Sequence, residues 1–300
     1  MPLFRQPIFD AHIHTRAGRC DTPAVFLEKT RSVGVAGGNV FSLHPAPDEP
    51  CAGEDQRFEA RLDKVLAFTS ETPGFLPYLF LDPREADATE QVRRAKEMGA
   101  RGLKIICAGF RIADHLAPVR AAAEMGLPVM FHCGILGKDG TSAAVNHPEC
   151  FECLFRIPGL RFSLAHLGWP WCDEYMGMVA MRALAHPPGG AAHFGVLYAD
   201  LTPGTPGIYR REALRKLYLT GYTVTGLAMW GCDLNINDYE VKYARWHLDR
   251  DNEILAEIER EYRTGAVDRR WLPDLSDIRS PLFGGAVWRA FNGLEANATS

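Results

Sequence analysis

The residues most suited to metal binding or catalysis are two histidines near the start of the chain, in the segment Phe9–His14. Side chains two positions apart on a β-strand share one face, so His12 and His14 would point the same way and Ile13 the opposite way. Imidazoles separated by about 6.6–7 Å along a strand can converge on one metal ion. On this motif alone, a pair of strand-end histidines held by hydrogen bonds stays open as an alternative.

Three further residues of metal-ligand type end later apolar runs of the sequence. His132 ends the fifth run, His166 the sixth and Asp233 the eighth. In a parallel barrel the C-terminal ends of all strands meet at one rim, where active sites lie. Residues of metal-ligand type at the ends of several predicted strands are less likely to occur together by chance than one such residue at one strand end. We therefore expect these side chains to join His12 and His14 in one site.

The elements that must position these residues follow a repeating strand–helix pattern. The apolar runs that predict strands are Pro7–Ile13, Gly38–Leu43, Phe75–Leu81, Gly102–Cys107, Leu127–Cys133, Leu160–Leu164, Val196–Leu201 and Gly226–Cys232. Helical patterns lie between or after them at Ala24–Val33, Ala86–Met98, Leu116–Met125, Cys172–Ala185, Arg210–Thr220 and Tyr239–Tyr262. Apolar strands that alternate with amphipathic helices indicate a parallel sheet covered by helices.

Eight such units predict an α/β fold of the (β/α)8 TIM-barrel type, which could be distorted, with a helical C-terminal tail. We expect one domain over residues 1–300. A doubly wound open sheet is the competing fold, but it usually carries a glycine-rich phosphate turn after its first strand. The sequence has no GxGxxG or GxxxxGK[ST] motif, and its first strand ends in histidines instead.

Composition and charge narrow the class of protein. The 300 residues are 47% hydrophobic and 23% charged, with a formal net charge of −4, which is ordinary for a globular protein. A weakly acidic chain argues against a nucleic-acid partner, and no basic run suggests binding to a membrane. We find no signal peptide and no apolar stretch of membrane-spanning length, so we expect a cytoplasmic protein whose cysteines are free thiols.

Taken together, the motifs resemble those of the amidohydrolase superfamily of metal-dependent hydrolases, and most closely its "amidohydrolase 2" branch. That branch also includes aminocarboxymuconate-semialdehyde decarboxylase. The matching segments are Asp10–His14, Arg101–Ile105, His132, Ala165–Gly168, Gly231–Asp233 and Phe283–Ala286. The resemblance covers almost the whole chain and implies a TIM barrel.

The resemblance implies that His12, His14, His132 and Asp233 bind a divalent metal, most plausibly zinc. Asp233 would also exchange a proton with the attacking water. His166 would then orient the metal-bound water, bind a second metal or polarise the substrate. Zinc favours imidazole and carboxylate ligands, and it lowers the pKa of a bound water to about 7.

Lys104 lies between apolar neighbours in the fourth predicted strand. Lysine is almost never fully buried without a partner. In several amidohydrolases a lysine of this strand, carbamylated on its amine, bridges two metals, so Lys104 and His166 could hold a second ion. A lysine that forms a salt bridge in the barrel mouth or contacts the substrate is an equal alternative. We favour one ion and leave two open.

Weaker candidates for substrate binding lie in the predicted rim loops. Arg16 could pair with a substrate carboxylate or be a solvated loop residue. His44 ends the second run and could line the pocket. Trp169 follows His166 and could line the pocket or pack on the next helix.

The predicted function is hydrolysis of a small amide, lactone or ester by metal-bound water. One alternative is a metal-dependent decarboxylase, a lyase acting on a small unsaturated or aromatic acid. The other is a barrel that binds a ligand without catalysis. We expect a small-molecule substrate and leave homo-oligomer formation open.

Overall fold

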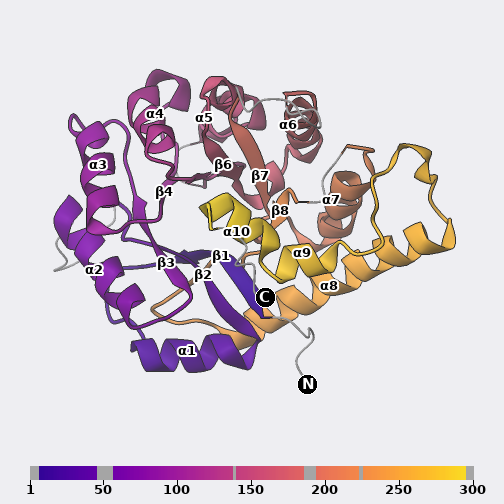
Figure 1. Cartoon of the computed structure of the whole chain (residues 1–300), viewed down its shortest axis with the longest axis horizontal. Coiled ribbons are helices and arrows are strands. Elements are labelled where there is room, and N and C mark those ends of the chain that lie inside the picture. Colours follow the sequence, from indigo (N-terminus) through magenta and orange to yellow (C-terminus); the bar gives the residue numbers. More distant parts are fainter. Residues whose placement is uncertain (1–6, 46–56, 138–139, 186–193, 223–225, 295–300) are drawn as a thin grey trace.

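Parallel strands and helices alternate along the chain in the computed structural model, which describes residues 7–45, 57–137, 140–185, 194–222 and 226–294 (Figure 1). The strands are β1 (Ile8–His14), β2 (Val35–Phe41), β3 (Phe75–Phe80), β4 (Gly102–Ile105), β5 (Val129–Phe131), β6 (Arg161–Leu164), β7 (Val196–Asp200), β8 (Ala228–Met229) and β9 (Leu234–Asn235). The α-helices are α1 (Pro23–Ser32), α2 (Phe58–Ser70), α3 (Ala88–Met98), α4 (Leu116–Glu124), α5 (Ser142–Val145), α6 (Cys172–Ala185), α7 (Gly207–Leu219), α8 (Val241–Thr264), α9 (Arg279–Phe283) and α10 (Ala286–Asn292).

The strands form one sheet in the order β8-β7-β6-β5-β4-β3-β2-β1-β9, and every neighbouring pair is parallel. The two strands at the ends of this order, β8 and β9, are joined by the short segment Trp230–Asp233. The Ala11 amide of β1 donates to the carbonyl of Trp230 at 2.9 Å. The sheet therefore curls back on itself, and the predicted TIM-barrel fold with a helical tail is confirmed.

The eighth predicted strand, Gly226–Cys232, differs from what the structure contains. Within this run only Ala228–Met229 is a strand (β8), and after a break at Trp230–Asp233 a second short strand, β9, begins at Leu234. Asp233 has a φ of 58° in the left-handed region, which interrupts a strand. A Cβ atom at Gly231 would lie only 2.8 Å from Cβ of His12, so this close approach to β1 requires glycine.

The core has an outer layer between strands and helices and an inner layer inside the barrel. Helix α10 contributes to the inner layer and lies across the middle of the ring of strands in Figure 1. Two hydrogen bonds anchor it: Trp288 Nε1 donates to Asn39 at 2.8 Å, and the hydroxyl of Tyr78 donates to Asn292 at 2.6 Å. The N-terminal end of the barrel is thereby filled, which leaves the C-terminal rim for a site.

A bulge in β1 aims the predicted histidines. Asp10 pairs with Gly38 of β2 but Ile13 pairs with Val40, so an extra residue is accommodated in β1 between these pairs. Asp10 consequently lies in the outer layer, where it accepts hydrogen bonds from the thiol of Cys232 and the hydroxyl of Tyr239. The histidines that follow turn to the inside of the barrel.

The six helices predicted from the sequence are confirmed as α1, α3, α4, α6, α7 and α8, with ends that agree within three residues. Helix α2 was not among the predicted elements. Within the described part of the chain, no helix is both long and apolar enough to cross a membrane.

Candidate functional site

Three of the predicted ligands converge at the C-terminal rim. His12 and His14 are on β1, and Asp233 lies just before β9. The Nε2 atoms of the two histidines are 3.1 Å apart, and Oδ1 of Asp233 lies 3.4 Å from Nε2 of His12 and 3.0 Å from Nε2 of His14. All three ligand atoms lie within 4.8 Å of one another. The left-handed backbone at Asp233 and the bulge in β1 are the local features that accompany this convergence.

Burial and charge set the protonation of this group. Burial lowers the pKa of His12 to about 4, and the charge of Lys104 acts in the same direction. Burial alone would raise the pKa of Asp233, but the neighbouring imidazoles of His12 and His14 outweigh it and hold that pKa well below its usual range. At neutral pH the site therefore offers a neutral imidazole at His12 and an ionised carboxylate at Asp233, which are the forms that bind metal.

Asp200, the last residue of β7, is a further acidic residue beside His12 that was not among the residues predicted from the sequence. Its Oδ2 atom lies 2.5 Å from Nδ1 of His12, and both side chains are almost completely buried. Burial would raise the pKa of Asp200, but the charge and hydrogen bond of His12 lower it overall. The sequence carries a signal similar to that of Asp233, because Asp200 is an acidic residue near the end of an apolar run, Val196–Leu201.

His166 lies in the short helical turn Ala165–Gly168 that follows β6, and its backbone is left-handed, with a φ of 61°. Its Nδ1 atom lies 2.5 Å from the carbonyl oxygen of Pro203 and 3.2 Å from the hydroxyl of Thr202. Its ring centroid is 5.7 Å from that of His12. His166 therefore borders the three convergent ligands, held from its Nδ1 side.

His132 follows β5 and lies beside His166, with 4.9 Å between the two ring centroids. Its Nε2 atom lies 3.2 Å from the carbonyl oxygen of Ile135. It is outside the group of three atoms that converge within 4.8 Å. A ligand role for His132 requires its imidazole to exchange the Ile135 contact for the ion.

Lys104 of β4 is buried at the same C-terminal rim, beside the convergent histidines; we call this part of the barrel the mouth. Its Nζ atom lies 3.3 Å from Nε2 of His12 and 5.2 Å from the centroid of the Phe41 ring. Burial lowers the pKa of Lys104 to about 8, against the opposing charges of Asp200 and Asp233. The amine is therefore closer to its neutral form than an ordinary lysine, in contact with the ligand set.

The three weaker candidates lie farther out on the rim. Arg16 is held through its backbone, where its amide donates to Oδ1 of Asn237 at 2.8 Å. His44 packs edge-on against the ring of Phe80, with 4.4 Å between centroids. Trp169 lines a surface cleft of about 410 Å³ between the start of α6 and α7. None of these contacts by itself assigns a substrate role.

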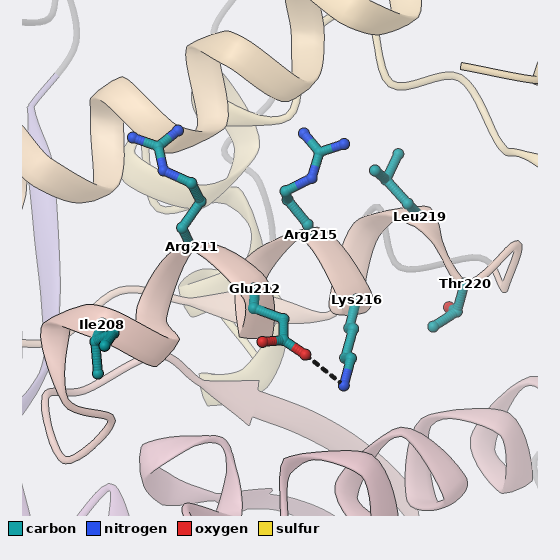
Figure 2. A pocket seen from close by; sticks show the side chains of 7 residues that line it. All are labelled: Ile208, Arg211, Glu212, Arg215, Lys216, Leu219 and Thr220. Atoms are coloured by element: carbon teal, nitrogen blue, oxygen red, sulfur yellow. Dashed lines mark ion pairs between the residues drawn. The ribbon is translucent and has the colours of Figure 1, made fainter.

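A larger groove of about 610 Å³ lies along α7, away from the histidines (Figure 2). Its three cationic side chains are each engaged within the chain. Arg211 pairs with Glu257, Arg215 with Glu261, and Lys216 with Glu212 and Asp173. Because these charges are already compensated, the groove offers no evident anion site.

The donor set at the rim fits a divalent cation. Two imidazole nitrogens and one carboxylate oxygen are ligands that zinc prefers, and three protein ligands are typical of catalytic zinc sites. The hydrogen bond between Nδ1 of His12 and Asp200 matches the outer partner that metal-binding histidines usually have.

Comparison with solved structures supports the fold. The chain is similar to a probable 2-pyrone-4,6-dicarboxylic acid hydrolase from Acinetobacter baumannii with citric acid bound (10% identity, 95% of this chain and 99% of that chain, TM-score 0.59). It is also similar to an amidohydrolase from Burkholderia multivorans with bound HEPES (12% identity, 95% and 99%, TM-score 0.56). A third similar structure is a dihydroorotase from Campylobacter jejuni (16% identity, 97% and 85%, TM-score 0.54).

At the level of sequence, no curated protein matches the chain significantly. The sequence model of the amidohydrolase family does match, and it covers residues 9–265. This range includes the histidines of β1, Lys104, His132, His166 and Asp233. The chain therefore belongs to the amidohydrolase family.

Proposed function

We propose that this protein is a metal-dependent hydrolase of a small amide, lactone or ester, and that His12, His14 and Asp233 hold a divalent cation, zinc in the first instance. The observation that carries the proposal is the convergence of their three ligand atoms at the C-terminal rim of the barrel. Membership of the amidohydrolase family supports it. We further propose that the protein acts in the cytoplasm, as its composition leads us to expect.

When bound, such a cation would acidify a water molecule and polarise the substrate carbonyl. The residues of the chain would then move the proton. Asp233 is ionised at neutral pH, so it can accept a proton from the attacking water and return it to the leaving group. His166 is held at Nδ1 by the Pro203 carbonyl, so its Nε2 side remains to orient water or substrate.

We keep His132 as the proposed fourth ligand, on the condition that it releases the Ile135 carbonyl. We favour one ion. A second would need an anionic bridge, and among the residues near His12 only Lys104, after reaction with CO2 to a carbamate, is proposed for that role.

The test is to assay protein loaded with zinc, protein treated with a chelator and protein reloaded with zinc against lactones, amides, esters and aromatic acids. We expect hydrolysis that disappears on chelation and returns with zinc. Unchanged circular dichroism after chelation would show that the barrel stays folded.

The same panel separates the alternatives. Release of CO2 from an unsaturated or aromatic acid, without hydrolysis, would establish the decarboxylase instead. Tight binding of a compound without turnover would indicate a binding barrel. Activity that is unaffected by complete metal removal would overturn the proposal.

A further inference from the structure

The segment Asp200–Thr205, which begins with the last residue of β7, contacts two histidines at the C-terminal rim through their Nδ1 atoms. Asp200 Oδ2 lies 2.5 Å from Nδ1 of His12. The Pro203 carbonyl lies 2.5 Å from Nδ1 of His166. In both rings the contact is made at Nδ1 and leaves Nε2 toward the site, so one segment restrains the orientation of both histidines.

We propose that Asp200 is a positioning residue that fixes the Nδ1–H tautomer of His12 and thereby leaves Nε2 unprotonated for a divalent cation. The positioning role of Asp200 rests on the proposed function only in that a divalent cation is taken to be what Nε2 of His12 binds. An ionised carboxylate can only accept a hydrogen bond, so Nδ1 of His12 must donate. In a neutral imidazole the lone pair then lies on Nε2.

The surroundings of Nε2 show why the tautomer matters. Nε2 of His12 lies 3.4 Å from Oδ1 of Asp233 and 3.1 Å from Nε2 of His14. A proton on Nε2 would point into this group and donate to the Asp233 carboxylate. That arrangement would occupy two of the three convergent ligand atoms with each other and block metal binding.

Asp200 is itself held in place. The backbone amide of Thr202 donates to its Oδ1 atom at 3.0 Å, so each carboxylate oxygen has a partner. The next residue, Leu201, accepts a hydrogen bond at 2.6 Å from the buried guanidinium of Arg210. The side chain of Asp200 is fully buried and cannot swing into solvent without breaking these contacts.

The first experiment reads the tautomer directly. Long-range nitrogen–proton NMR of the metal-free full-length protein would assign the His12 ring by the signal lost in His12→Gln. We expect Nδ1 protonated and Nε2 bare. A proton on Nε2 of His12 in the wild-type protein would overturn the proposal, and this result needs no metal and no Asp200 variant.

The second experiment measures affinity for Zn²⁺ alone, by competition with a chromophoric chelator, in wild type and Asp200→Asn. Loss of an outer partner of this kind typically costs 10–100-fold in metal affinity. We expect a loss of that order. Asp82→Asn is the matched control, because Asp82 also lies at the C-terminal end of a barrel strand but pairs with Arg84 and contacts none of the three proposed ligands. The zinc affinity of Asp82→Asn should stay within about twofold of wild type, well short of the 10–100-fold loss expected for Asp200→Asn.

Equal zinc affinity in wild type and folded Asp200→Asn would overturn the proposal. If Asp200→Asn fails to fold by circular dichroism, the NMR result on wild type decides alone. A protein that binds no zinc at all, yet shows the Nδ1–H tautomer, would contradict the proposed function and leave the positioning role of Asp200 supported.

Discussion

Two clusters of buried and partly buried ionisable groups invite comparison. The mouth cluster consists of His12, His14, Lys104, Asp200 and Asp233. The α7–α8 cluster lies between those two helices and consists of Arg210, His247, Arg250 and Asp251. Both contain histidine, carboxylate and cation, so residue type alone does not distinguish them.

The α7–α8 cluster is closed by paired charges. Arg210 binds both carboxylate oxygens of Asp251, through Nε at 3.0 Å and Nη2 at 2.6 Å. Arg250 lies 2.5 Å from Nδ1 of His247. The positive charges of Arg210 and Arg250 would repel a cation, so this cluster is not suited to bind one.

In the mouth cluster, by contrast, potential metal ligands face one another and, among the described residues, are not paired with arginines. Two imidazole nitrogens and a carboxylate oxygen face one another, and its single lysine has a pKa lowered by burial to about 8. The comparison teaches that convergence of acceptor atoms, rather than burial of histidine and aspartate, separates a candidate metal site from a structural ion pair.

The largest effect should come from Asp233→Asn. It replaces the proposed proton acceptor by an amide of the same size and also weakens one of the three proposed metal ligands, so the assay is run with zinc in excess. General acid–base catalysis alone is worth roughly 10²–10⁴-fold. We expect kcat to fall by that factor with little change in KM, measured on the substrate found in the panel. Retention of more than about a tenth of wild-type kcat would remove Asp233 from the mechanism.

In the other cluster, Asp251→Asn should affect stability. It leaves the buried Arg210 without its partner, and breaking a buried pair costs about 3–5 kcal/mol. Urea unfolding would measure this loss. Asp249→Asn makes the same change at an exposed position of α8 and should stay within about 0.5 kcal/mol of wild type. Equal stability of the two variants would show that the ion pair is not structural.

A third effect, smaller than that of Asp251→Asn over any one pH unit, should appear in the pH dependence of stability. Burial lowers the pKa of His247 to about 3, with Arg210 and Arg250 acting in the same direction against Asp251. Between about pH 6.5 and 3 the unfolded chain therefore binds a proton that the native state does not, and stability falls as the pH falls. The contribution approaches about 1.4 kcal/mol per pH unit.

His247→Gln should remove this contribution. We expect the difference in unfolding free energy between wild type and variant to change with pH over that window, as measured by urea unfolding at several pH values. Parallel curves from pH 7 to pH 4 would mean that His247 is not a neutral buried group.

The smallest effect concerns the number of ions. If one ion is bound, Lys104→Gln should leave the zinc content per chain unchanged. A crystal structure of the zinc-loaded protein should show one anomalous peak beside an unmodified lysine. Two peaks about 3.5–4 Å apart, with extra density on the amine, would contradict the one-ion proposal.

Sequence patterns predicted the barrel because strand and helix periodicities are local. They also predicted that His12, His14 and Asp233 belong together, since parallel strands end at one rim. They could not show that Nε2 of His132 faces the Ile135 carbonyl, because loop conformation depends on packing. The run Asp249–Arg263 has the mixed-charge composition that is typical of a solvated helix face. Asp251 and Glu259 are nevertheless buried, because Arg210 and Arg279 from other elements pair with them.

The most direct test of the metal centre is zinc content, measured by elemental analysis after loading and removal of free metal. Wild type and His247→Gln, which changes a buried histidine outside the mouth, should each hold at least one zinc per chain. His12→Ala should hold far less. Zinc well below one equivalent in wild type, or equal zinc in wild type and His12→Ala, would contradict the account.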